Sequence, residues 1–553
     1  MLSAVMAVTA LTGCETVKKS DLTGGSDPQS IFGGNSNDKD STTIPVDSYP
    51  DYPVSFPAIE QTDTGDVYEA ENGSLSEGLT TSSERTNFSG NGYVTGFSGD
   101  GSETVVFDVE APSNQHYDMT FCIASDEIAK CTVYLNESEI SHFETTSDGA
   151  FTKITLYGVF LVVGSSEVKI TVSDADICLD YLKLTNNTSL SEVSYEADGQ
   201  LSNVNAGESA KELMSFLTEN YGDYIIAGQY VSGTENKELE LIYRTTGKLP
   251  VIRFDALENC GDNFDESFKK IDASAQWHRN GGIVGLMWYW ESPGENPSVY
   301  AEDTDFRLSD AVTDINIAQL SQEEIRGLYG EGKISEQCYG LILDIDNMSG
   351  QLLSLKNKGI PGLWRPLHEA SGDWFWWGAS DIEDYKWLWE LMYERMTEYF
   401  GLDNLIWIWN GQSADTLVDK DTFDIACVDI YLSEGKEFKS RYEQFASLQR
   451  IVGTDKLIAL SECSSVPDID ACFRDNAVWS FFGVWYGKYL MTSEGEYSEK
   501  YALKDSLIRA YNSSGVLTLD EYTAMKENPE SVQDNTEENT AEASEAETSE
   551  ETE

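Results

Sequence analysis

The chain has 553 residues, of which 40% are hydrophobic, 11% aromatic and 24% charged, a balance typical of globular proteins with two or three domains. Its formal net charge of −61 argues against nucleic acid or an anionic bilayer as a partner, because both would repel it.

The first segment, residues 1–14, is the apolar run MLSAVMAVTALTGC, which resembles a bacterial lipoprotein signal ending in its lipobox. The resemblance implies cleavage and lipidation of Cys14, and hence an extracellular, cell-surface lipoprotein of a bacterium that meets the membrane only through its lipid anchor. A secretory signal with a chance cysteine is the alternative. No later segment is apolar over the roughly 18 residues that a membrane span needs. Residues 15–65 are rich in Ser, Asp, Gly, Thr and Pro, which predicts a flexible linker.

Residues 66–186 have the pattern of an all-β domain. Short alternating runs such as TVVFDVEAP and EVKITV are separated by Gly, Asn, Asp and Ser turns. This pattern predicts a sandwich of two antiparallel sheets, as in jelly-roll-like domains.

Three stretches of this domain, VYEAENG, SGNGYVTGF and ICLDYLKLT, resemble carbohydrate-binding module family 35 and its relatives. The resemblance implies a glycan-binding module, with Tyr93 and nearby loops as candidate sugar contacts. It also implies a structural calcium ion, for which Glu69, Glu71 and Asp180 are the candidate ligands. Ordinary surface carboxylates are the alternative interpretation of these three residues.

Residues 205–513 alternate between short apolar runs and helical patterns. One helix is predicted over 341–355, where apolar residues recur every three or four positions before Gly359 and Pro361. Another is predicted to begin at Ser380, with Glu383 completing a capping box. Eight strands are predicted, at 224–230, 249–255, 282–290, 361–369, 404–410, 423–431, 455–462 and 479–487.

Eight strand–helix units in about 300 residues predict an α/β fold, the (β/α)8 TIM barrel. A doubly wound open sheet is the alternative, but no glycine-rich phosphate loop follows the first predicted strand. Residues 514–553 are mostly Glu, Asp, Ser, Thr and Ala, and this composition predicts an acidic disordered tail.

Catalytic residues of such a barrel lie where strands end at the C-terminal face. Two carboxylic acids, Glu369 and Glu462, end the fourth and seventh predicted strands, so they face each other across the barrel mouth. A pair about 5–5.5 Å apart supports retaining glycoside hydrolysis, in which one acid protonates the leaving oxygen and the other attacks the anomeric carbon. A salt-bridge role is the alternative for either acid alone. Other polar or aromatic residues at strand ends are Trp288, Tyr289, Trp290, His368, Asp429, Tyr431 and Trp485.

The acid must keep its proton near neutral pH, whereas the nucleophile must stay ionised. A tyrosine hydroxyl can help to hold the nucleophile ionised, and Tyr431, one strand before Glu462, is placed to do so. The indoles near Glu369 suit the apolar faces of sugar rings. We expect Trp374 to contact substrate, one of Trp376 and Trp377 to pack inward, and Trp364 to lie in the core.

The stretches RNGGIVGLMW, GIPGLWRPLHEASGDWFWWG, VDIY and LIALSE resemble glycoside hydrolase family 26 over the entire barrel. The resemblance implies Glu369 as general acid/base and Glu462 as nucleophile. His368 would support the acid, Tyr431 would hydrogen-bond the nucleophile, and Trp374 and Trp485 would form sugar platforms.

One departure concerns the end of the third strand, where the family commonly has Ser-Trp-His and this chain has Met287-Trp288-Tyr289. Tyr289 therefore replaces a histidine expected to touch the sugar, which bears on sugar specificity. The resemblance thus predicts Trp288 and Tyr289 as substrate-binding residues.

The function expected from the resemblance is a retaining endo-β-1,4-mannanase acting on mannan, glucomannan or galactomannan. Catalysis is expected to need no cofactor, and the chain is expected to be a monomer. The alternatives are a β-glucanase or β-1,3-xylanase of the same fold, or a surface lipoprotein that captures glycans without turnover.

The cysteines beyond Cys14 include no CxxC pair, so a structural zinc site is not expected. Export permits disulfides, and a Cys463–Cys472 pair is possible from the spacing. Because several cysteines sit in apolar stretches, buried free thiols are the plainer interpretation.

Overall fold

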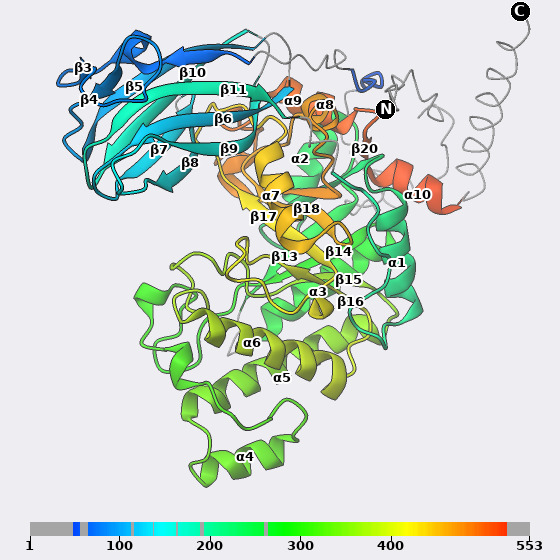
Figure 1. Cartoon of the computed structure of the whole chain (residues 1–553). Helices are drawn as coiled ribbons and strands as arrows, with labels where there is room; N and C mark the ends of the chain where they lie inside the picture. Colours follow the sequence, from blue (N-terminus) through cyan, green and yellow to red (C-terminus); the bar gives the residue numbers. More distant parts are fainter. Residues whose placement is uncertain are drawn as a thin grey trace, which may run out of the picture. The chain divides into compact units, whose positions relative to one another are not determined.

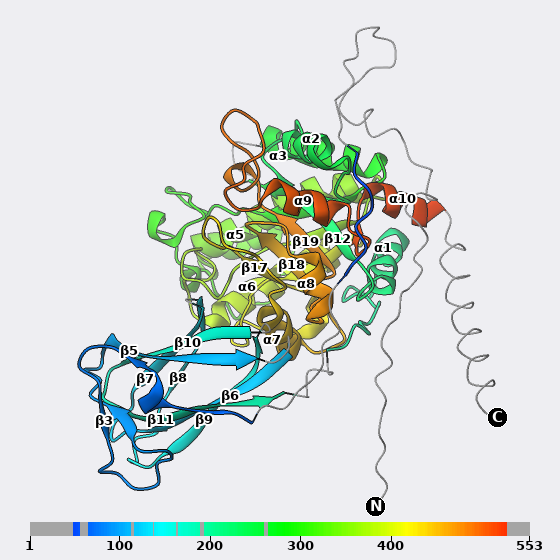
Figure 2. The same cartoon turned by 90° about the horizontal axis from the view of Figure 1, so that it is seen from above.

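The computed structural model describes residues 48–55, 65–111, 115–136, 138–161, 164–187, 193–258 and 264–527. The signal segment with Cys14, the linker up to residue 47 and the tail beyond residue 527 lie outside the described residues. The chain divides into two compact units, one of residues 57–193 and the other of residues 1–56 and 194–553. Figures 1 and 2 show the chain in two views.

The unit of residues 57–193 is an antiparallel β-sandwich, drawn in blue and cyan in Figure 1. One sheet has the order β3-β4-β11-β6-β9, with β1 also paired to β11, and the other has the order β2-β5-β10-β7-β8. The strands are β1 Val67–Glu69, β2 Ser74–Leu75, β3 Thr80–Ser82, β4 Tyr93–Thr95, β5 Asp100–Ala111, β6 Gln115–Ala124, β7 Lys130–Leu135, β8 Ser138–Glu144, β9 Thr152–Leu161, β10 Gly164–Ser173 and β11 Cys178–Asn186.

Alternating residues of these strands make the core of the sandwich. On β5 the buried side chains are Val105, Phe107 and Val109, separated by residues that face the other way. Side chains of a strand point to opposite faces in turn, so one face of each sheet is apolar and packs on the other. The two-sheet prediction for residues 66–186 is confirmed.

The second unit holds a closed barrel of eight parallel strands in chain order, β12 to β19, in which β13 pairs with both β14 and β12. In Figure 2 strands β12, β17, β18 and β19 lie inside a ring of helices. The strands are β12 Ile225–Val231, β13 Ile252–Leu257, β14 Ile283–Trp288, β15 Gly362–Arg365, β16 Leu405–Trp409, β17 Ile425–Ile430, β18 Leu457–Cys463 and β19 Phe481–Val484. The predicted (β/α)8 TIM barrel is confirmed.

Helices follow most of the barrel strands. Between β16 and β17, the structure has a short 3-10 helix, Lys420–Thr422, in place of an α-helix. The helices are α1 Glu208–Glu219, α2 Lys237–Thr246, α3 Phe264–Arg279, α4 Gln322–Gly330, α5 Glu336–Lys356, α6 Ile382–Glu394, α7 Tyr442–Val452, α8 Ile469–Arg474, α9 Lys504–Tyr511 and α10 Leu519–Glu527.

The predicted helix over 341–355 is confirmed as part of α5, whose apolar face is buried. The capping box predicted at Ser380 is wrong. Helix α6 is capped by the Asp381 position without a side-chain hydrogen bond, and the Ser380 hydroxyl donates to the Asp384 carboxylate at 2.6 Å.

One aromatic ring fills part of the barrel interior. Phe254 on β13 lies so close to its neighbours that a Cβ added at Gly285 would meet the ring at 2.2 Å, and one at Gly228 would meet it at 2.6 Å. These two glycines, on β14 and β12, therefore let the strands close around Phe254.

Two segments outside the predicted barrel boundaries belong to the barrel unit. Strand β20, Val516–Leu517, pairs in parallel with β12, and α10 follows with Leu519 and Tyr522 buried. The boundary placed at residue 514 is therefore wrong, because the apolar residues just after it are part of the core.

The end of the predicted linker is also attached to the barrel unit. The Tyr52 amide donates to the Asn512 carbonyl at 2.7 Å, and the Tyr52 carbonyl accepts from the Ser514 amide at 2.8 Å. The Arg509 guanidinium lies 5.3 Å from the centre of the Tyr52 ring. Residues 48–55 are thus a strap on the barrel unit, so the prediction of a flexible linker is wrong for these eight residues.

Seven cysteines are free and buried: Cys122, Cys131, Cys178, Cys338, Cys427, Cys463 and Cys472. The possible Cys463–Cys472 disulfide is therefore absent, and the buried-thiol interpretation is confirmed for these seven. Within the described ranges, no helix has the length and apolar character of a membrane span.

Candidate active site

The turn after β15 places Glu369 at the C-terminal end of the barrel. Leu367 and Glu369 have φ angles of 49° and 51°, in the left-handed region that side chains other than glycine rarely adopt. The Glu369 amide donates to the Asn410 carbonyl at 2.9 Å, which ties this turn to the end of β16. Backbone strain of this kind costs about 1–3 kcal/mol per residue and clusters at functional sites.

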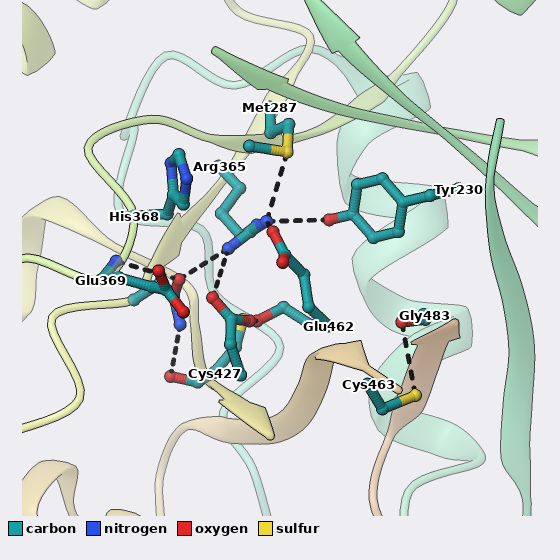
Figure 3. Close-up of polar contacts among 12 residues, drawn as sticks. Tyr230, Met287, Arg365, His368, Glu369, Cys427, Glu462, Cys463 and Gly483 are labelled. Atoms are coloured by element: carbon teal, nitrogen blue, oxygen red, sulfur yellow. Dashed lines mark hydrogen bonds and ion pairs between the residues drawn. The ribbon is translucent and has the colours of Figure 1, made fainter. Parts of the chain in front are cut away.

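Arg365 lies at the centre of a buried polar cluster near Glu369 (Figure 3). Its guanidinium donates to Asn410 Oδ1 at 2.6 Å, to Asp429 Oδ2 at 2.9 Å, and to Glu462 Oε1. It also donates to the Tyr230 hydroxyl at 3.0 Å. The Arg365 side chain is 2% exposed, so its positive charge acts at low dielectric on the carboxylates around it.

Glu462 ends β18 and is buried with its carboxylate held on both oxygens. Oε1 accepts from Arg365, and Oε2 accepts from the Tyr431 hydroxyl at 2.5 Å. Tyr431 follows β17 and is 39% exposed, so the hydroxyl reaches Glu462 from the open side of the barrel. The predicted pairing of Tyr431 with Glu462 is confirmed by this geometry.

Three carboxyl groups, Glu369, Asp429 and Glu462, lie within electrostatic range of the one guanidinium, so full ionisation leaves a net negative charge in a buried place. Burial raises the pKa of Glu369 to about 7, with the charge of Asp429 raising it further and Trp374 and Arg365 opposing. Burial also raises the pKa of Glu462 above its usual value, and the charges of Asp429 and Glu369 add to this, whereas Arg365 and the Tyr431 hydroxyl oppose it. Because these groups interact strongly, the titration belongs to the cluster.

Direct contacts decide which carboxyl keeps the shared proton. The described hydrogen bonds of the Arg365 guanidinium reach Glu462 and Asp429, whereas none of them reaches Glu369. Glu462 also accepts the Tyr431 hydrogen bond. The charged form is stabilised most at Glu462, so Glu369 is the group that stays protonated near neutral pH.

Trp374 lies beside Glu369 and is 50% exposed. Its indole N–H donates to Glu369 Oε2 at 2.9 Å, so the ring stands at the edge of the acid with one face open. An indole face that is open beside a carboxyl group can stack against a flat apolar ligand surface. This placement agrees with the expectation that Trp374 contacts substrate.

His368 is buried and packs among aromatic rings. Its ring centre lies 4.5 Å from that of Phe375 and 5.9 Å from that of Tyr289. Burial and the charge of Arg365 lower the pKa of His368 well below its usual value, so the imidazole is neutral. His368 supports the turn next to Glu369 through packing, and its carbonyl accepts from the Trp377 indole at 2.8 Å.

Trp288 does not face the barrel mouth, and its prediction as a substrate-binding residue is wrong. Its side chain is 1% exposed and stacks on Trp290, with ring centres 4.0 Å apart. Met287 contacts Arg365 inside the barrel, and successive residues of a strand point to opposite sides. Trp288 therefore points outward between the strands and helices, whereas Tyr289 points to the mouth.

The other tryptophans near the site are either buried or placed at the barrel mouth. Trp364, Trp376 and Trp377 are all buried, as expected for Trp364 and for one of the other two. Trp485, which follows β19, is half-buried; its ring centre lies 4.6 Å from that of Tyr230 and 4.8 Å from that of Tyr486. The ring is placed at the barrel mouth near the Arg365 cluster, where it can serve as a platform.

In the sandwich, the three predicted calcium ligands lie around one turn. Ser89 donates through its amide to Asp180 at 2.9 Å and through its hydroxyl to Glu69 at 2.6 Å, and the Asn91 amide donates to Glu71 at 2.8 Å. Burial, with the neighbouring acids adding, raises the pKa of Glu69.

A metal ion at this cluster finds little support in the geometry. Glu71 Oε2 is a buried oxygen that accepts no hydrogen bond. The other carboxylate oxygens of the cluster described above already accept hydrogen bonds from Ser89 and Asn91. Across the described ranges, no three Asp, Glu, His or Cys side chains are arranged to hold a metal ion. The predicted calcium ion stays a prediction. Tyr93 is 3% exposed, so its ring is a core residue and not a sugar contact.

Sequence reasoning missed the role of Arg365 and left Asp429 without one. A signal was present, because an arginine within the apolar strand PGLWRPLHE needs a buried acidic partner. Asp429 at the end of β17 is that kind of partner, as is Glu462.

Residues 202–521 match the model of glycosyl hydrolase family 26. A mannan endo-1,4-beta-mannosidase of Thermothelomyces thermophilus is 30% identical over 479 residues, which cover 84% of this chain and 92% of that protein. The crystal structure of a Podospora anserina GH26-CBM35 beta-(1,4)-mannanase is 30% identical with a TM-score of 0.53, over 83% of this chain and 99% of that one.

A beta-mannanase from a symbiotic protist of the termite Reticulitermes speratus, solved with a gluco-manno-oligosaccharide, is 26% identical with a TM-score of 0.51. That match covers 59% of this chain and 98% of that one. The Podospora likeness reaches beyond the family match, as the resemblance of both domains implied. The chain belongs to glycosyl hydrolase family 26 and is a glycoside hydrolase.

Proposed function

We propose that the protein is a retaining endo-β-1,4-mannanase that hydrolyses mannan, glucomannan or galactomannan by double displacement. The observation that carries the proposal is the unequal environment of the two acids. Glu462 accepts from Arg365 and Tyr431, whereas Glu369 accepts from the neutral Trp374 N–H. Relatives that match most of the chain are named mannan endo-1,4-beta-mannosidases, which supports the choice of polymer.

In the first step, Glu369 gives its proton to the oxygen that leaves, while the carboxylate of Glu462 attacks the anomeric carbon. The bond between that carbon and the leaving oxygen breaks, and a bond between the sugar and Glu462 forms. The raised pKa of Glu369 keeps its proton available near neutral pH.

In the second step, the ionised Glu369 takes a proton from water, and the water oxygen attacks the same carbon. The bond to Glu462 breaks, and its carboxylate is released to Arg365 and Tyr431. These two donors stabilise the leaving carboxylate, so they favour the second step as well as holding the resting state.

Aromatic platforms position the chain of sugars. The exposed Trp374 ring beside Glu369 and the half-buried Trp485 ring at the end of β19 are both proposed to stack against sugar faces. The chemistry proposed uses carboxyl groups alone and needs no cofactor. Any calcium ion belongs to the sandwich cluster of Glu69, Glu71 and Asp180.

The sandwich is proposed to bind the same polymer weakly and so to raise the local concentration of substrate at the barrel. We further propose that the chain acts as a monomer at the bacterial cell surface, anchored through lipid at Cys14. Metabolic labelling with a fatty-acid analogue, compared between the wild type and Cys14→Ala, tests the anchor.

Release of reducing sugar from purified polymers tests the function. We expect release from mannan, glucomannan and galactomannan, and little from mixed-linkage β-glucan or β-1,3-xylan. Activity on glucan but not on mannan would overturn the proposal that mannan-type polymers are the substrate. Binding of polymer without any release would favour a capture protein over an enzyme.

A further inference from the structure

Tyr300 is an exposed aromatic residue at the barrel mouth to which neither the sequence nor the comparisons assign a role. It lies on the loop after β14 and is 42% exposed. Its hydroxyl is 2.7 Å from the hydroxyl of Tyr289, the residue at which this chain departs from the family pattern. The two rings meet edge to face, with centres 6.4 Å apart.

The backbone around Tyr300 is fixed to the loop that carries Trp374. Tyr300 and Phe375 form an antiparallel bridge, and their rings stack with centres 5.7 Å apart. The Ala301 amide donates to the Trp374 carbonyl at 2.8 Å, and the Trp376 amide donates to the Val299 carbonyl at 3.1 Å. The position of Tyr300 is therefore coupled to that of the Trp374 platform.

The tyrosine pair lies next to the turn that carries Glu369. Burial raises the pKa of Tyr289, and the neighbouring Tyr300, Tyr486 and Glu462 contribute in the same direction. The Tyr289 ring packs on His368, the neighbour of Glu369, with centres 5.9 Å apart.

The paired hydroxyls of Tyr289 and Tyr300 can form further hydrogen bonds to a ligand, which packing of the two rings alone does not require. Each tyrosine hydroxyl has one donor and an acceptor oxygen, so one bond between the two leaves a second O–H and free lone pairs. Sugar hydroxyls both donate and accept. A hydroxyl fixed before binding loses little further freedom when a sugar arrives.

We propose that Tyr300 is a substrate-binding residue whose hydroxyl, held by Tyr289, hydrogen-bonds a sugar hydroxyl at the barrel mouth beside the Trp374 loop. Tyr289 acts as the positioning residue of the pair. This inference rests on the proposed function, since it requires a glycan in the cleft. The competing view is that Tyr300 only fastens the two loops together through its ring.

Tyr300→Phe separates the two views, because it keeps the ring on Phe375 and removes only the hydroxyl. We expect kcat/KM on a manno-oligosaccharide to fall about 3- to 10-fold, the range of one neutral hydrogen bond, mostly through KM. The melting temperature should stay within about 2 °C of the wild type. Tyr329→Phe is the matched control, since Tyr329 is similarly exposed on α4 and stacks on Tyr339.

Tyr289→Phe and the double variant test the positioning. We expect Tyr289→Phe to raise KM in the wild-type background and to have less than about a twofold effect in the Tyr300→Phe background, because coupled residues are not additive. A Tyr300→Phe enzyme with kcat and KM equal to those of the wild type overturns the proposal, as do fully additive effects. Wild-type protein inactive on every polymer would instead count against the proposed function.

Discussion

Arg365 and Glu462, 97 residues apart in the chain, form an ion pair in which both side chains are buried. The same guanidinium also holds Asp429 and Asn410, and Asn410 in turn contacts the amide of Glu369. Arg365, at the end of β15, therefore holds the proposed nucleophile Glu462 directly. It holds the proposed acid Glu369 indirectly, through Asn410 and the Glu369 backbone amide.

Arg365→Met should abolish most of this organisation. Loss of the positive charge raises the pKa of Glu462, so a higher pH is needed to ionise it, and the acid limb of the kcat/KM profile should move to higher pH. Breaking a buried pair costs about 3–5 kcal/mol of stability. Thermal unfolding and the pH profile check both effects. An acid limb that stays in place would show that Arg365 does not control Glu462.

Glu369→Ala should affect substrates according to their leaving groups. A mannan oligosaccharide, whose leaving oxygen needs a proton, should react at least about 100-fold more slowly, whereas an activated aryl mannoside should lose far less. Steady-state kinetics on both substrates makes the comparison. Equal losses on the two would contradict the role of Glu369 as the acid.

The alkaline limb of the pH profile should report Glu369, because its proton is needed in the first step and its pKa is raised by burial and by the charge of Asp429. Asp429→Asn removes a negative charge that raises the pKa of Glu369, so the limb should move to lower pH. The measurement is kcat/KM of the wild type and of Asp429→Asn at about five to ten pH values between roughly pH 5 and 9, at fixed ionic strength. This series is enough to locate a limb of a bell-shaped profile. No movement would mean that another group limits the alkaline side.

Trp374→Phe should move the same limb the opposite way. The Trp374 N–H stabilises the Glu369 carboxylate, so its removal raises the pKa and shifts the limb to higher pH. The phenyl ring still offers a smaller stacking surface, so KM should rise about 3- to 10-fold, as expected for partial loss of an aromatic contact. A shift to lower pH would contradict the hydrogen bond.

The strap of residues 48–55 should stabilise the barrel without taking part in catalysis. A chain that starts at residue 56 should unfold about 2–6 °C below one that starts at residue 48, since it loses the bonds of Tyr52 to Asn512 and Ser514. Both chains should show the same kcat. Equal melting temperatures for the two would mean that the strap contributes nothing to stability.

The sequence was sufficient for the barrel because each strand has a continuous apolar run, and for Glu369, Glu462 and Tyr431 because they end such runs. It was insufficient where the direction of a side chain decides. Trp288 and Tyr289 are neighbours in the same motif, yet only Tyr289 points to the mouth, and a shift of one residue along a strand reverses this.

Contacts between distant segments were the other limit. Nothing local to Tyr300 or Tyr52 predicts their partners, because Phe375 and Asn512 are brought to them only by the closed barrel. The segment 516–522 was missed because the acidic composition of the tail concealed four apolar residues that the barrel buries.

The most direct test of the central claim is to trap the sugar on its nucleophile. A 2-deoxy-2-fluoro mannosyl fluoride slows both steps but the second step more, so a covalent sugar–enzyme species should accumulate and be located by peptide mass spectrometry. We expect the label on Glu462 and no label in Glu462→Ala. A label on any other residue, or inversion at the anomeric carbon of the first product, would contradict the central claim.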